Sequence, residues 1–295
     1  MNNDHKIRGT VCGIAATVTW GINGTVSQYV LQHYDLDSMW LACWRMLFAG
    51  FVIFLFTIIR KGRGCFEILK DKKSLRDLII FAVFGLLFNQ LCYFTAIQNT
   101  DAGTATVMQS MSTIVILIAT SFTARRFPGF YKTAAVLLAL TGVYLISTES
   151  GIGLSLTPKG LFWGLLLAIA AASYILLSRP LVDRWDSLTV VGYGMLLGGI
   201  LFSIIYRPLR FHPGLDTAFY FYFAFIVLFG TILAFSLFLL CIHDLGPVSG
   251  NLIGNIEPMT ATILTAVLLH TSFSARDLAG FACILISVMI VQILT

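Results

Sequence analysis

An acidic side chain followed directly by proline lies in the apolar stretch "GNIEPMTATIL", as Glu257 and Pro258. A carboxylate in apolar surroundings is costly unless it is paired, hydrogen-bonded or protonated. Proline has no N–H, so the carbonyl of Gly254 loses its helical partner; Asn251 and Asn255 make the segment more polar. Two interpretations stay open. Glu257 is either a proton- or substrate-binding carboxylate at a movable helix joint, or a structural carboxylate bonded to neighbouring helices.

Further polar and aromatic side chains interrupt other apolar stretches. Arg45, in "ACWRML", can bind an anionic group, extend outward to water, or pair with a helix end. Amide side chains cost free energy in lipid unless they face protein or water, whereas aromatic ones also serve in packing and interfacial belts. This second set contains Trp20, Asn23, Asn89, Gln90, Tyr93, Gln109 and Trp163.

The composition identifies the surroundings of these residues. The chain has 295 residues, of which 58% are hydrophobic and 11% are charged, and its mean hydropathy is +0.88. Soluble domains are roughly 45–50% apolar and about 25% charged. The sequence therefore predicts an all-α membrane protein. The apolar run that begins at Val11 continues to about Val30 without an A-x-A cleavage site, which favours a retained spanning helix over a signal peptide.

Ten apolar segments of about 20 residues are long enough to span a bilayer. They cover residues 9–30, 38–59, 77–97, 104–123, 131–148, 160–178, 188–206, 218–241, 248–270 and 278–294. With the N-terminus in the cytoplasm, cytoplasmic segments hold 14 Lys and Arg residues and outer segments hold 4. This bias predicts a multi-pass plasma-membrane protein with both termini in the cytoplasm.

The two halves of the chain repeat one pattern. "YFTAIQNTDAGTATVMQSMST" from Tyr93 aligns with "FLLCIHDLGPVSGNLIGNIEP" from Phe238, and the offset between matched segments drifts between 145 and 151 residues. A five-span unit has an odd count, so its second copy must cross the membrane in the opposite direction. We therefore expect two inverted repeats, residues 1–150 and 151–295, of the kind that builds transporter sites near the membrane midplane.

With "ACWRML", "YFTAIQNTDAGTATVMQSMS" and "LGPVSGNLIGNIEPMTATIL" in these places, the chain resembles the EamA-type ten-helix members of the drug/metabolite transporter superfamily. The resemblance covers nearly the whole chain. It implies a cavity lined by spans one, three, four, six, eight and nine, to which the polar and aromatic set and Asn255 contribute. Two features depart from many relatives: Thr113 stands where proline is common, and the Gly-Glu pairs at the ends of spans four and nine are missing.

The resemblance implies a secondary transporter that exports amino acids or related metabolites, with protons as a further ligand of Glu257 or with facilitated diffusion. The alternatives are a drug or nucleoside-type carrier, a lipid-handling protein or intramembrane enzyme, and a signalling scaffold. Against an enzyme, the spans carry no nucleophile–base pair. Monomer and homodimer both remain open.

Other motifs indicate less. The six cysteines contain no C-x-x-C pair, and the sequence has no zinc pattern or Walker loop, so we expect no metal and no cofactor. The basic loop 60–76 lacks the aromatic interleaving expected for nucleic acid. His243 and Asp244 precede Gly246-Pro247, which predicts a solvated cytoplasmic turn.

Overall fold

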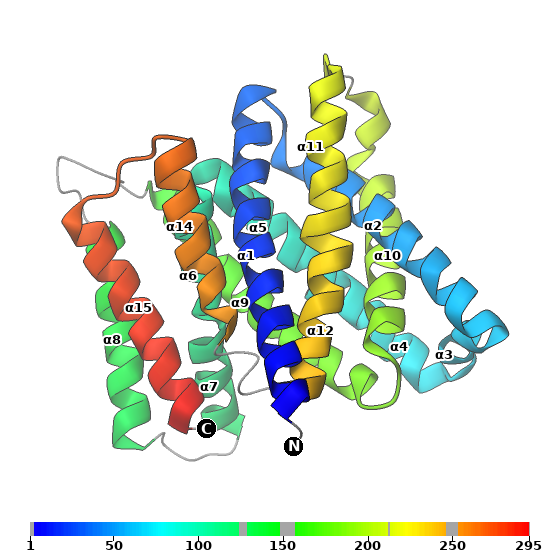
Figure 1. Cartoon of the computed structure of the whole chain (residues 1–295), viewed down its shortest axis with the longest axis horizontal. Helices are drawn as coiled ribbons and strands as arrows, with labels where there is room; N and C mark the ends of the chain where they lie inside the picture. The colour runs from blue at the N-terminus through cyan, green and yellow to red at the C-terminus, as the bar shows by residue number, and fades with distance from the viewer. Residues whose placement is uncertain (1–2, 124–128, 148–156, 212, 246–252, 295) are drawn as a thin grey trace.

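The structure is a computed structural model that describes residues 3–123, 129–147, 157–211, 213–245 and 253–294. All regular secondary structure in these ranges is helical. The helices run side by side, and the two termini lie at the same end of the bundle (Figure 1). His243 has no described side chain, and Asn251 lies outside the described residues.

The helices follow the predicted spans closely. In the first half they are α1 Asn3–His33, α2 Ser38–Lys61, η1 Gly62–Phe66, α3 Glu67–Lys70, α4 Lys72–Ile80, η2 Phe81–Leu87, α5 Phe88–Asn99, α6 Ala102–Ser110, α7 Ser112–Thr123 and α8 Phe130–Ser147. In the second half they are α9 Pro158–Val182, α10 Ser187–Tyr206, η3 Pro208–Arg210, α11 Thr217–Val227, η4 Leu228–Leu233, α12 Ala234–Leu245, α14 Ile256–Leu268 and α15 Ala275–Leu294.

Length and composition allow seven helical segments among the described residues to cross a membrane. They correspond to the second, third, fourth, sixth, seventh, eighth and tenth predicted spans. Phe130–Ile146 and Ile256–Leu268 are shorter apolar helices. The first predicted span is α1, which carries buried polar side chains at Asn23, Thr25 and Gln28. The protein is a helical multi-pass membrane protein, while the ten-span arrangement stays a prediction.

Aspartates in the predicted breaks start the next helices. Asp37, Asp71, Asp101, Asp186 and Asp216 each accept a hydrogen bond from a backbone N–H in the first turn that follows. This is N-capping, which satisfies donors that a helix terminus leaves unpaired. The Tyr34 hydroxyl also donates to Asp216 and holds the pKa of that carboxyl below its ordinary value.

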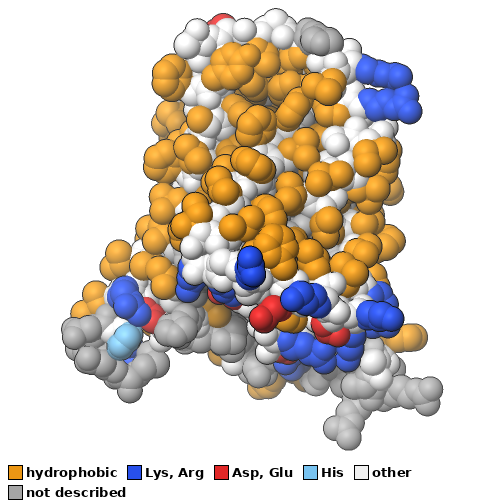
Figure 2. Space-filling view, turned by 90° about the vertical axis from the view of Figure 1, so that its right-hand side faces the viewer, with side chains coloured by type: hydrophobic (Ala, Val, Ile, Leu, Met, Phe, Trp, Pro, Cys, Tyr) orange, Lys and Arg blue, Asp and Glu red, His pale blue; other side chains and the backbone are white. Residues whose placement is uncertain are grey.

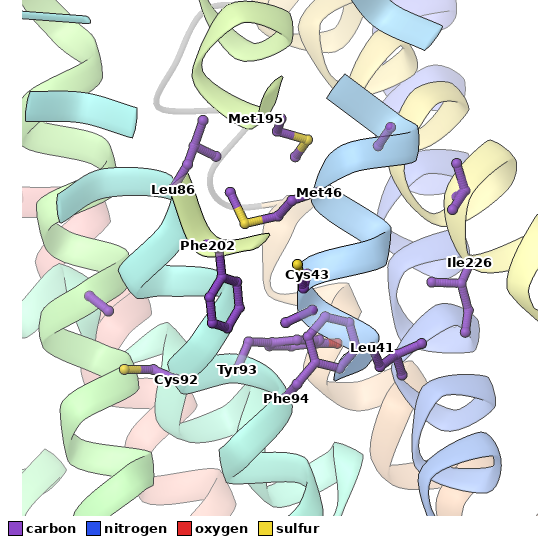
Figure 3. Packing of buried hydrophobic residues seen from close by; sticks show 14 of the residues in the cluster. Leu41, Cys43, Met46, Leu86, Cys92, Tyr93, Phe94, Met195, Phe202 and Ile226 are labelled. Carbon is purple, nitrogen blue, oxygen red and sulfur yellow. The ribbon is translucent and has the colours of Figure 1, made fainter. Parts of the chain in front are cut away.

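The helices pack in a regular set of pairs: α2 with α10, α8 with α15, α1 with α12 and α14, α9 with α5 and α6, and α6 with α14. A large apolar cluster joins α2, α5 and α10; Figure 3 shows Met46, Tyr93 and Phe202 within it. A second cluster joins α6, α7, α8 and α15. These clusters hold the polar side chains described below in fixed positions.

The surface separates apolar and basic regions. Figure 2 shows hydrophobic side chains over the middle of one face and Lys and Arg gathered near its lower end. That end is the one at which the termini lie in Figure 1. An apolar girdle with basic residues at one end is typical of a protein held in a bilayer.

Candidate functional site

Arg45 projects from α2 into the bundle. It is 4% exposed, so it does not extend to water. Its Nε donates to Thr231 Oγ1 at 2.9 Å, and its guanidinium carbon lies 5.2 Å from the ring centre of Phe94. A guanidinium has five N–H donors, and the bond to Thr231 is the one it makes among the described residues. Arg45 therefore keeps hydrogen-bonding capacity in a buried position.

Thr231 receives this contact from an unusual backbone segment. It lies in η4, a π-helical stretch within the eighth predicted span, and its hydroxyl donates to the carbonyl of Ile226 at 3.1 Å. That bond uses the hydroxyl proton and leaves the oxygen free to accept from Arg45. Single π-helical turns inside α-helices are frequent at functional sites. Sequence reasoning missed Thr231, for which a hydroxyl in "FGTILAF" was a weak signal.

Glu257 lies in the first turn of α14, where the partial positive charge of a helix N-terminus favours an anion. The chain is helical at Ile253 and Gly254, turns at Asn255 and is helical again from Ile256, so the predicted interruption before Pro258 is present. Glu257 is half-buried and makes no hydrogen bond or ion pair with the part of the chain that is described. A Cβ added at Gly254 would meet open space.

Arg45, Tyr93 and Glu257 act on one another electrostatically. Arg45 and Glu257 are nevertheless not within the 4 Å of an ion pair in the described chain. The Tyr93 hydroxyl lies against α1, where it is 3.0 Å from the position of a Cβ at Gly24. Two opposite charges therefore face a common region without neutralising each other directly.

The fourth predicted span is interrupted at a matching position. α6 ends at Ser110, Met111 is in a turn, and α7 begins at Ser112. Met111 precedes Asn255 by 144 residues, within one residue of the offset that relates the two halves. The interruption forms although Thr113 replaces proline there. Discontinuous helices of this kind border substrate sites in many transporters.

Four amide side chains of the predicted set have buried oxygen atoms without a hydrogen-bond partner in the described structure: Asn23, Asn89, Gln90 and Gln109. Asn23 packs against Gly230 in η4, next to Thr231. Buried polar atoms usually find a partner in protein or ordered water. These oxygens therefore indicate water or a polar ligand inside the bundle.

The remaining predicted residues have other surroundings. Trp20 packs its ring against Phe235 and Phe238, at centroid distances of 5.1 and 4.9 Å. Trp163 is half-buried on α9 and packs against the main apolar cluster. Asn255 donates to Gln292 Oε1 on α15 at 3.0 Å, which joins two helices. The structure thus brings Arg45, Tyr93, Glu257 and Asn23 around one region and gives Trp20 and Asn255 partners of their own.

The prediction of a solvated turn at Asp244 is wrong. Asp244 is 5% exposed and accepts two hydrogen bonds from Arg8, at 2.8 Å from Nε and 2.7 Å from Nη2. His5 Nδ1 lies 3.5 Å from the same carboxylate. The contact forms because α1 and α12 pack together and bring residues 236 positions apart to one end of the bundle.

Chemistry that depends on metal-ligand clusters has no candidate here. No group of three or more His, Cys, Asp or Glu residues within the described ranges could hold a metal ion. The site offers one guanidinium, one carboxylate, a phenol and several amides. Such groups bind and orient a polar small molecule.

Comparison with known proteins identifies the family of the chain. The EamA-like transporter family model matches residues 7–148 and again residues 158–293. The uncharacterized inner membrane transporter YicL of Salmonella typhimurium is 32% identical over 97% of this chain and 95% of its own length. The WAT1-related chloroplastic protein At3g02690 of Arabidopsis thaliana is 23% identical over 92% of this chain and 66% of its own. A solved structure titled "Crystal structure of protein" matches with a TM-score of 0.65 and 16% identity, over 97% of this chain and 98% of that one. The chain belongs to the EamA-like transporter family.

Proposed function

We propose that the protein is a secondary transporter that exports amino acids or related zwitterionic metabolites across the plasma membrane by alternating access. One observation carries the proposal. Arg45 and Glu257 face a common region in the bundle, interact electrostatically, and keep hydrogen-bonding capacity that no described residue uses. An ionisable residue inside a membrane bundle is a functional-site hypothesis by default.

A zwitterion complements this pair of charges. Its carboxylate can take the guanidinium N–H groups of Arg45, which suit planar carboxylates. Its ammonium group can lie beside Glu257. The unpartnered amide oxygens of Asn23 and Gln109 can accept from the same ligand. A ligand with one charge would leave Arg45 or Glu257 buried without a partner, which is costly.

Glu257 also provides a way to couple transport to protons. Protonation removes its negative charge and so removes the partner of the ligand's ammonium group. A proton arriving at Glu257 would release the substrate, and the next substrate would displace the proton. The interruption of the helix at Asn255 gives this carboxylate a movable support.

Reciprocal helix contacts support an inverted repeat. Gly50 of α2 packs against the backbone of Leu196 on α10, and Gly199 of α10 packs against the backbone of Leu47 on α2. Gly50 and Gly199 are 149 residues apart, and so are Leu47 and Leu196. A twofold axis relates each residue of one half to a counterpart in the other half. Where two residues are in contact, the axis places their two counterparts in the same contact.

A second pair of contacts follows the same rule. Gly9 of α1 packs against Asp244 at the end of α12, and Gly160 of α9 packs against Asn99 at the end of α5. The π-helical segments η2 and η4 also begin 147 residues apart. With the two separate family matches, these contacts support two five-helix repeats, residues 1–150 and 151–295. Two halves of one design can exchange conformations, which is the basis of alternating access.

Orientation follows from charge. Lys and Arg gather near the end that holds both termini, so we place that end in the cytoplasm. Export then carries substrate from the Arg8–Asp244 end to the opposite end.

The test is transport by the purified protein in proteoliposomes, with a panel of labelled amino acids on one side and a pH gradient across the membrane. We expect counterflow of at least one amino acid.

Glu257→Gln should raise the apparent KM at least tenfold and abolish the dependence of transport on the pH gradient. Arg45→Lys should raise the KM for the zwitterion but not for the corresponding amine. Glu67→Gln, at the exposed start of α3, is the matched control. A wild-type pH response in a well-folded Glu257→Gln protein would refute the role of this carboxylate. Transport of nucleosides or drugs only would favour the other carrier class.

A further inference from the structure

Another buried acid lies far from Glu257 in the sequence, at the start of α6. Asp101 is 1% exposed and caps this helix: its Oδ1 accepts from the backbone N–H of Thr104 at 2.9 Å. Its other oxygen, Oδ2, is buried and has no hydrogen-bond partner within the described residues. A carboxylate with one unpaired oxygen in a buried position is costly to keep ionised.

The surroundings of Asp101 contain a second unused group. The hydroxyl oxygen of Thr104, also 1% exposed, is buried without a partner in the described chain. Thr262 of α14 lies close by, because its Oγ1 and the Asp101 Oδ1 are 2.8 and 3.0 Å from the position of a Cβ at Gly103. The Thr262 hydroxyl therefore lies close to the carboxylate that caps α6.

Asp277, in the first turn of α15, is the charged residue that acts on Asp101. It is 2% exposed, and its Oδ2 accepts from the N–H and hydroxyl of Ser274 at 2.8 and 2.7 Å. The other helices around α6 present neutral groups: Gln28 on α1, which accepts from the N–H of Ala102, Gly160 on α9 and Thr262 on α14. Within the described residues, no cation forms an ion pair with Asp101.

These surroundings favour a proton on Asp101. Burial raises the pKa of Asp101 above its ordinary value, and the charge of Asp277 acts in the same direction. The Thr104 side chain and the backbone N–H groups of Thr104 and Gly103 act in the opposite direction. A protonated Asp101 turns the unpaired oxygen into a donor, for which the hydroxyl oxygen of Thr104 is an available acceptor.

We propose that Asp101, with Thr104 and Asp277 beside it, is a proton-binding site that controls the opening of the bundle at the end opposite the termini. This inference rests on the proposed transport function for its consequence but not for the site itself. Figure 1 shows the connection between α14 and α15 at that end. Loss of the proton places an unpaired negative charge in a buried position where α6 packs against α14 and α15, and favours separation of α6 from these helices.

The site has a direct mechanical path to Glu257. α6 touches α14 backbone to backbone at Gly103, where a Cβ would come 2.8 Å from Thr262 Cα. The Thr262 hydroxyl donates to the carbonyl of Pro258 at 2.8 Å, next to Glu257. A displacement of α6 at Asp101 is therefore passed to the helix that carries the central carboxylate.

The experiment compares wild type with Asp101→Asn, which keeps an oxygen able to cap α6. Infrared spectra are recorded in a Glu257→Gln background, so that the central carboxyl does not contribute. We expect a carbonyl band of a protonated carboxylic acid at neutral pH that disappears in Asp101→Asn. Because the folded protein binds this proton more tightly than the unfolded chain, wild type should lose stability as pH rises from the ordinary pKa of an aspartate to the raised value, and Asp101→Asn should not. The control, Asp35→Asn, is an exposed aspartate at the same end of the bundle and should keep the wild-type profile.

Three outcomes decide the matter. A band that survives in Asp101→Asn, or a melting profile identical to wild type, overturns the site. If sodium at constant pH raises the melting temperature of wild type but not of Asp101→Asn, the site binds a metal cation and not a proton. If the transport rate of the wild-type protein does not depend on external pH, Asp101 does not control the opening of the bundle. Spectra and melting need no transport, so a proton on Asp101 in a protein that moves no amino acid would refute the proposed function and support the site.

Discussion

The crossing of α2 and α10 provides a quantitative test of the packing on which the repeat depends. A Cβ at residue 50 would lie 2.5 Å from Leu196 N and 2.8 Å from Leu196 Cα, while ordinary contact begins near 3.4 Å. The obstructing atoms are backbone and cannot rotate away, so the helices would have to separate by about 1 Å. Overpacking of this kind costs about 1–3 kcal/mol. Alanine regains about 1 kcal/mol in helix propensity over glycine.

Gly50→Ala should therefore destabilise the protein by up to about 2 kcal/mol net, and lower its melting temperature in detergent by a few degrees. Gly199→Ala should have a smaller effect in the same direction, because its closest backbone atom, Leu47 N, is at 2.9 Å. Gly64→Ala is the control, since a Cβ there meets nothing within 4 Å. A Gly50→Ala protein as stable as the Gly64→Ala protein would show that α2 and α10 are not in backbone contact and would remove one support of the twofold arrangement.

Two further tests address the ends of the bundle. In a chain without native cysteines, a cysteine at position 70 should react with an impermeant reagent only after cells are opened, whereas one at position 35 should react in intact cells; the reverse pattern would invert the proposed topology. In a chain that keeps Cys241 alone, Asp244→Asn should speed labelling of this thiol several-fold, because Cys241 packs against Gly13 one turn from the Arg8 contact. Unchanged labelling would show that the ion pair does not hold α1 and α12 together.

Local features of the structure could be predicted from the sequence because they depend on neighbouring residues. Aspartates in "NTDAG" and "HYDLD" marked helix starts, since N-capping acts over three residues. Proline at 258 marked the interruption that the structure has at Asn255. The break of the fourth span at Met111 was not predicted, because Thr113 stands there in place of a proline.

Contacts between distant helices could not be predicted in the same way. Thr231 binds Arg45 across 186 residues, and Asp244 binds Arg8 across 236. Each partner is chosen by helix packing and, for Thr231, by a π-helical turn that shifts its hydroxyl. Hydropathy contains neither kind of information. The same limit explains why the hydrogen bond from Asn255 to Gln292 of α15 was not predicted.

The proposed repeat is symmetric in its helix packing but not in its charged residues. Arg45 of α2 lies beside η4, while its counterpart 149 residues later is Gly194 of α10, which packs against Phe81 of η2. A second arginine at 194 would put another cation into the apolar cluster without a carboxylate to pair with, and a buried unpaired charge is strongly destabilising. Under the proposed function, matched backbones would give both halves the same two conformations. A charge at only one of the two repeat-related positions would orient a single zwitterion in one direction, and would give the bundle one site instead of two.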